Sequence, residues 1–99
     1  MNFVFQPEAE TEFNQAIDYY EAISPALGYD FAQEIHQTIQ RITHFPNAWP
    51  VVKGQIRRSL VKRFPYGILY TEYQGQLLII AVMNLHRKPD YWLNRIKLD

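Results

Sequence analysis

Three pairs of adjacent cations in the second half of the chain are the residues best suited to chemistry on a phosphate or an acidic surface. They are Arg57-Arg58, Lys62-Arg63 and Arg87-Lys88, and His86, Tyr91 and Arg95 lie close to the last pair. Arginine and lysine bind phosphate oxygens, and aromatic rings between them stack on bases. On neighbouring strands, the three pairs would converge near one rim of a sheet and form a binding surface. In the alternative interpretation, they form a solvated strand edge that discourages aggregation.

The formal net charge of zero conceals a division between the two halves of the chain. Residues 1–50 carry seven acidic side chains and one basic one, whereas residues 51–99 carry nine basic and three acidic ones. The halves therefore have formal charges of −6 and +6. The basic half predicts a surface that meets a polyanion or an acidic protein. We interpret the carboxylates of the acidic half as the solvated face of helices.

Several classes of site are absent from the sequence. There is no cysteine, which excludes disulfides and zinc–thiolate centres. His36 and His44 are eight residues apart and have no ligand-spaced partner. No glycine-rich phosphate loop, GxSxG or HExxH motif occurs. We therefore expect no metal site and no cofactor.

Length and hydropathy predict a single domain over residues 1–99. This length is near the commonest domain size. The first residues lack the basic and apolar regions of a signal peptide. The longest apolar run, Leu77 to Met83, has seven residues and is too short to cross a membrane. We expect a cytoplasmic location and no membrane contact.

The hydrophobic period changes from helical to extended near Gly54, which predicts an α+β domain. Pro7 and Pro25 suit the first positions of two amphipathic helices. Almost nothing separates these helices, so they should form an antiparallel hairpin. The expected elements are a short strand at 3–5, a helix at 7–23, a second helix that begins at Ser24-Pro25 and stops before Pro46, a loop at 45–50, a three-stranded antiparallel meander at 56–64, 66–73 and 77–85, and a short C-terminal helix at 90–96.

Two adjacent aromatic residues in the last segment should play different parts. Neighbours on a helix point about 100° apart, so only one of the two can face the core fully. We expect Trp92 to be the buried anchor and Tyr91 to be the more exposed ring near the basic rim.

Four motifs are informative together. They are Tyr19-Tyr20 at the end of the first helix, Ser24-Pro25-Ala26-Leu27-Gly28, Arg63-Phe64-Pro65-Tyr66-Gly67-Ile68-Leu69-Tyr70, and His86-Arg87-Lys88-Pro89-Asp90-Tyr91-Trp92 with Arg95. With the order of elements, these motifs resemble the RelE/ParE superfamily, the small toxins of type II toxin–antitoxin systems. The resemblance covers the whole chain and implies a RelE/ParE-like fold. The Phe-Pro-Tyr strand entry and the Pro-x-Tyr-Trp ending favour the ParE-like branch.

The ParE-like branch implies a protein that inhibits DNA gyrase, has no hydrolytic site and is neutralised by a cognate antitoxin. Under this favoured interpretation the chain is not an enzyme. The residues expected to contact the target or the antitoxin are Arg57, Arg58, Lys62, Arg63, Arg87 and Arg95. We expect the antitoxin to cover apolar surface of the helical hairpin, to place acidic residues near Arg57, Arg58 or Arg87, and to form a dimeric or higher hetero-oligomer with the toxin.

The RelE-like branch implies the alternative, an endoribonuclease that cuts mRNA on the ribosome. Such an enzyme needs cations around the scissile phosphate and groups that move protons. The catalytic candidates are then His86, Arg87 and Tyr91, and Arg57, Lys62 and Arg63 would join Arg87 at the phosphate. No carboxylate is evident for this site, because Glu72 is expected at the far end of the sheet and Asp90 is expected to cap the last helix. A third possibility is an inactive homologue that only binds antitoxin.

Overall fold

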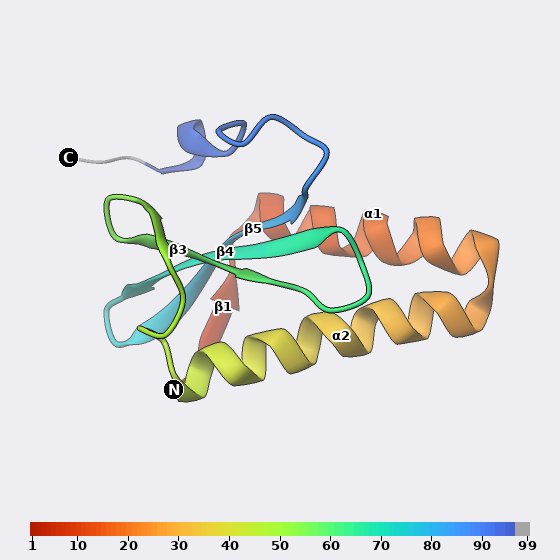
Figure 1. The fold of residues 1–99 in the computed structure, drawn as a ribbon, viewed down its shortest axis with the longest axis horizontal. Coiled ribbons are helices and arrows are strands. Elements are labelled where there is room, and N and C mark those ends of the chain that lie inside the picture. Colours follow the sequence, from red (N-terminus) through yellow and green to blue (C-terminus); the bar gives the residue numbers. More distant parts are fainter. Residues whose placement is uncertain (97–99) are drawn as a thin grey trace.

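The computed structural model describes residues 1–96, which form one sheet with a helical hairpin on one face and a C-terminal segment on the other (Figure 1). The order of elements confirms the α+β class expected from the sequence. The elements are β1 (Phe3–Phe5), α1 (Pro7–Ile23), α2 (Pro25–His44), β2 (Val51–Lys53), β3 (Ile56–Leu60), β4 (Tyr66–Tyr73), β5 (Gln76–Asn84) and the 3₁₀ helix η1 (Leu93–Arg95).

The sheet has the order β1-β5-β4-β3-β2, in which β1 is parallel to β5 and the other neighbours are antiparallel. Four strands therefore follow the helices, whereas the sequence predicted three. The missed strand is β2, which folds back on β3 through a turn at Gly54 with φ of 55°. All three of its residues are exposed, so no buried face marked it in the sequence.

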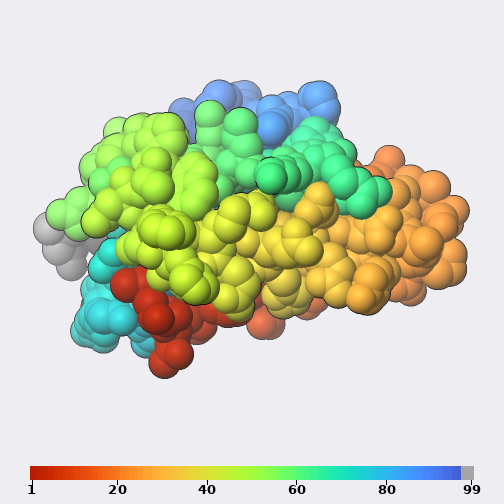
Figure 2. Space-filling model, turned by 60° about the horizontal axis from the view of Figure 1, so that its bottom comes forward, coloured from red at the N-terminus to blue at the C-terminus, as the bar shows by residue number. Residues whose placement is uncertain are grey.

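The strand predicted at 56–64 was too long, because the structure ends β3 at Leu60. A loop then leads into β4, and within it Arg63 adopts a left-handed conformation with φ of 72°. Backbone in this region cannot continue a strand. Figure 2 shows this loop against the N-terminal half of α2.

The helical hairpin forms as predicted, with a single residue between its two helices. Ser24 is extended, with φ of −163° and ψ of 133°, and it is both the C-cap residue of α1 and the N-cap residue of α2. Its hydroxyl makes no capping hydrogen bond. Gly28 keeps the helices close, because a Cβ atom there would lie 2.9 Å from the Cβ of Glu21.

Both faces of β5 are covered, which explains its nearly continuous apolar sequence. The larger core lies between the sheet and the helices and includes Phe13, Phe31 and Ile79. A smaller core lies on the opposite face, where Trp92 of the C-terminal segment packs with residues that include Ile80 and Met83. No helix of the described residues is long and apolar enough to cross a membrane.

Candidate functional site

Glu12 of α1 is the centre of a network that joins α1, β5 and the C-terminal segment. Its side chain is 13% exposed and forms an ion pair with Arg95, whose side chain is 12% exposed. The two Arg95 nitrogens lie 2.8 and 3.0 Å from the two Glu12 oxygens, so the pair is bidentate. The backbone N–H of Val82 also donates to Glu12 Oε1, at 3.1 Å. This carboxylate is a structural centre and not part of a solvated helix face.

Tyr91 lies between two arginines and is tied to the same carboxylate. Its hydroxyl donates a hydrogen bond to Glu12 Oε2. The guanidinium carbon of Arg87 is 3.7 Å from the centre of the Tyr91 ring, and that of Arg95 is 5.0 Å from it. Tyr91 is half-buried and is more exposed than Trp92, which is 3% exposed, so the sequence correctly predicted Trp92 as the buried anchor.

The environment of Tyr91 favours its neutral form. Burial raises the pKa of Tyr91 above its ordinary value near 10, and the hydrogen bond to Glu12 and the charge of Glu12 raise this pKa further. The charges of Arg95 and Arg87 act in the opposite direction. The hydrogen bond to Glu12 also raises the pKa of Arg95. In this arrangement the Tyr91 phenol is held as a hydrogen-bond donor and is poorly suited to accept a proton.

This environment predicts a specific loss of stability at alkaline pH. Unfolded Tyr91 ionises near pH 10, whereas folded Tyr91 stays protonated to higher pH, so its contribution is complete below about pH 10 and declines above it. In urea unfolding at increasing pH, Tyr91→Phe should lose stability less steeply than the wild type, by up to about 1.4 kcal/mol per pH unit. Tyr20 and Tyr70, whose pKa values burial also raises, remain in both proteins. Equal slopes for the two proteins would contradict the assignment.

Three exposed basic residues, His86, Arg87 and Lys88, follow the end of β5. The side chain of Arg87 is 53% exposed, although its guanidinium lies over the Tyr91 ring and makes a long contact of 3.5 Å to Glu12. His86 and Lys88 are exposed on either side of it. We call these three residues the basic end of β5.

The other predicted cations do not converge with this basic end. Adjacent strand residues face opposite sides of a sheet, and Arg57 and Arg58 do so here. Arg57 donates to the Trp49 carbonyl at 2.6 Å on the helix side. Arg58 lines a hollow with Met83 and Trp92 on the side of the C-terminal segment. The expectation that both members of this pair reach one rim is therefore wrong.

Arg63 lies at yet another place. It pairs with Asp30 near the start of α2, at 3.3 Å, in an exposed ion pair that contributes little to stability. The adjacent Lys62 is exposed. Arg57 lies near Pro46, beyond the other end of α2, and the 14 residues from Asp30 to His44 correspond to about 21 Å of helix. The cations are therefore distributed over the surface.

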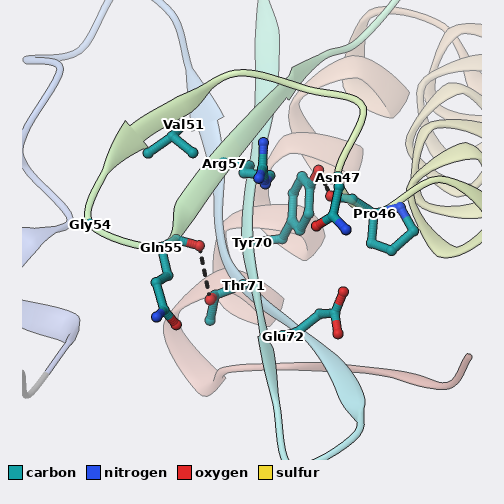
Figure 3. Close-up of a pocket in the computed structure, with 9 residues that line it drawn as sticks. All are labelled: Pro46, Asn47, Val51, Gly54, Gln55, Arg57, Tyr70, Thr71 and Glu72. Carbon is teal, nitrogen blue, oxygen red and sulfur yellow. Dashed lines mark hydrogen bonds between the residues drawn. The ribbon is translucent and has the colours of Figure 1, made fainter.

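Arg57 is one of the residues that line a separate pocket of about 370 Å³ (Figure 3). Tyr70 closes one side and donates its hydroxyl to the Pro46 carbonyl at 2.7 Å. Glu72 also lines this pocket. Its position six residues along β4 from Tyr66, which pairs with Asn84, corresponds to about 20 Å. Glu72 is thus remote from His86, as the sequence predicted.

Sequence reasoning missed Glu12, although one signal was present. Glu12 lies three residues after Ala9 and four before Ala16, both buried, and it therefore borders the apolar stripe of α1. Its partners are up to 83 residues away in the chain. Within residues 1–96, no three histidine, aspartate or glutamate side chains gather as metal ligands.

Comparisons with known proteins agree with this fold. A family model described as the ParE toxin of the type II toxin–antitoxin system parDE matches residues 3–91. A solved structure, "Chromosomal ParDE TA system from P. aeruginosa", superposes with a TM-score of 0.76 at 16% identity, over 87% of this chain and 97% of that chain. At this identity the likeness concerns the fold. No curated protein matches.

Proposed function

Because the chain belongs to the ParE toxin family of type II toxin–antitoxin systems, we propose that it arrests growth by binding DNA gyrase and thereby inhibits replication. Its cognate antitoxin neutralises it by forming a hetero-oligomer with it. The toxin acts as a single domain in the cytoplasm, where both gyrase and the antitoxin are located. It binds its target without hydrolysing it.

The state of Tyr91 is the observation that carries this proposal. Its phenol, a candidate proton-transfer group for a ribonuclease, is committed as a donor to Glu12, and its pKa is raised. Arg95, another candidate cation, is largely buried and paired with the same carboxylate. Of the residues around Tyr91, the basic end of β5 stays exposed, and it suits binding to an acidic surface better than catalysis.

Replacing Arg87 with alanine should weaken toxicity while leaving the fold intact. Its side chain is 53% exposed and its contact with Glu12 is long, and an exposed contact between a cation and a ring, such as that with Tyr91, contributes only about 0.5–1 kcal/mol. The loss should therefore reduce binding more than stability. We expect growth inhibition on expression to fall at matched protein levels, with a melting temperature within a few degrees of the wild type.

Lys53→Ala is the matched control for this experiment. Lys53 is an exposed cation on β2, at the opposite edge of the sheet from β1. The Lys53→Ala protein should therefore retain full toxicity. Undiminished growth inhibition by Arg87→Ala would contradict a role of the basic end in target binding.

A ribosome-dependent ribonuclease is the second candidate function, and Glu12 is the observation that favours it. The structure places this carboxylate beside Arg87 and Tyr91, where the sequence offered none. Ectopic expression separates the candidates. Filamentation with induction of the DNA-damage response indicates gyrase, rapid arrest of translation indicates the ribonuclease, and normal growth indicates an inactive antitoxin binder.

A further inference from the structure

β5 is longer than the strand that covers its outer edge. β5 spans nine residues, but β1 pairs with only Leu77, Leu78 and Ile79. The last backbone bond from this side is donated by Gln6 N–H to the Ile79 carbonyl, at 2.9 Å. Among residues 1–96, no strand lies beside the remainder of this edge.

The hydrogen bonds between β5 and β4 show in which direction each backbone group of β5 beyond Ile79 points. Leu85 N–H donates to the Pro65 carbonyl at 2.9 Å, so the backbone groups of Leu85 point toward β4. Because the direction of the backbone groups alternates along a strand, those of Met83 also point toward β4, and those of Val82 and Asn84 point away from it. The bond from Val82 N–H to Glu12 independently confirms this direction.

Side chains already satisfy part of the open edge. Arg95 donates to the Ile80 carbonyl at 3.2 Å, and Glu12 accepts from Val82 N–H. The Val82 carbonyl and the Asn84 N–H point to the same side but have no strand neighbour among the described residues. An acceptor and a donor two residues apart are the groups that an added strand bonds.

These two groups lie at a groove of about 180 Å³, which we call the β5-edge groove. It is lined by residues of α1, by the end of β5 and by Arg87, namely Glu12, Gln15, Ala16, Tyr19, Tyr66, Val82, Asn84 and Arg87. Tyr19 is 63% exposed and offers a ring to a neighbouring side chain. Arg87 offers the positive charge, and the exposed His86 and Lys88 lie next to it in the chain.

We propose that the β5-edge groove binds an extended, acidic segment of the antitoxin. The segment adds to the edge of β5 through the Val82 carbonyl and the Asn84 N–H, and it places a carboxylate on Arg87. The main-chain bonds provide affinity and the carboxylate fixes the register. This inference rests on the antitoxin partner of the proposed function, but it does not depend on gyrase as the target.

Hydrogen exchange of single amides tests the inference directly. The full-length chain is compared by NMR free and in complex with its full-length cognate antitoxin. The backbone amide proton of Asn84 should exchange at least about 100-fold more slowly in the complex, because this N–H gains a hydrogen bond. The Val82 amide, already bonded to Glu12, should change less. An Asn84 exchange rate that is the same in both states would overturn the inference.

Charge reversal tests the carboxylate contact. Arg87→Glu should weaken antitoxin binding at least about tenfold, as expected for the loss of a charge-assisted bond. Lys53→Glu, on β2, should bind as the wild type does. Equal weakening by both variants would overturn the specific contact. If Arg87→Glu does not fold, the Asn84 exchange in the wild type decides.

Two other occupants are separated by the same samples. Slow Asn84 exchange in the free chain that appears only at high protein concentration would mean that a second copy fills the groove, and it would overturn the proposal. A helical antitoxin segment over Asn84, recognised from its NMR chemical shifts, would also overturn it. Because the readout is antitoxin binding, failure here and failure of gyrase inhibition are distinguishable.

Discussion

Replacing Glu12 with alanine is expected to lower the free energy of unfolding by about 3–5 kcal/mol. The change leaves the Arg95 guanidinium largely buried without its counter-charge, and it removes the acceptor of both Tyr91 and Val82. For a domain of this length the melting temperature should fall by roughly 12 °C or more. Thermal and urea unfolding both measure the effect.

Two variants show that the effect belongs to the ion pair. Glu10→Ala removes an exposed acid of the same helix and should cost less than about 1 kcal/mol. Combining Glu12→Leu with Arg95→Met removes both charges and should recover much of the loss, because apolar replacements of buried pairs are often neutral. A Glu12→Ala protein as stable as Glu10→Ala would contradict the central position of this carboxylate.

Trp92→Ala is expected to destabilise the protein by about 3–5 kcal/mol, the usual result of deleting a large buried aromatic side chain. Trp92 is 3% exposed and packs in the smaller core with residues that include Ile80 and Met83. Its indole N–H donates to the Pro89 carbonyl at 2.7 Å, so its loss also releases the start of the C-terminal segment. Equilibrium unfolding in urea gives the value.

An exposed aromatic residue provides the comparison. Tyr73 is 60% exposed at the end of β4, and Tyr73→Ala should change stability by no more than about 0.5 kcal/mol. If the Trp92→Ala and Tyr73→Ala proteins had the same melting temperature, the C-terminal segment would not form a second core.

Local signals in the sequence predicted most of the fold. Pro7 and Pro25 begin the two helices, and the single residue between the helices leaves the chain no alternative to a hairpin. β5 was recognisable because both of its faces are buried. β2 was not recognisable, because its three exposed residues form a strand only through the turn at Gly54 and the pairing with β3.

The site was less predictable because it depends on contacts between distant parts of the chain. Nothing near Glu12 in the sequence reveals its pairing with Arg95, 83 residues later. Likewise, adjacency in the sequence suggested that Arg57 and Arg58 act together, whereas strand alternation directs them to opposite faces. The basic end of β5 was predictable, because Arg87 and its neighbours directly follow a strand whose apolar sequence defines where it ends.

Supercoiling by purified DNA gyrase, measured with and without the purified toxin, tests the proposed function most directly. We expect the wild type to inhibit supercoiling, Arg87→Ala to inhibit it less, and added antitoxin to restore it. Ribosome-bound mRNA incubated with the same toxin should remain uncut. Unimpaired gyrase, together with codon-positioned mRNA cuts that disappear in His86→Ala, would contradict the account and establish the ribonuclease.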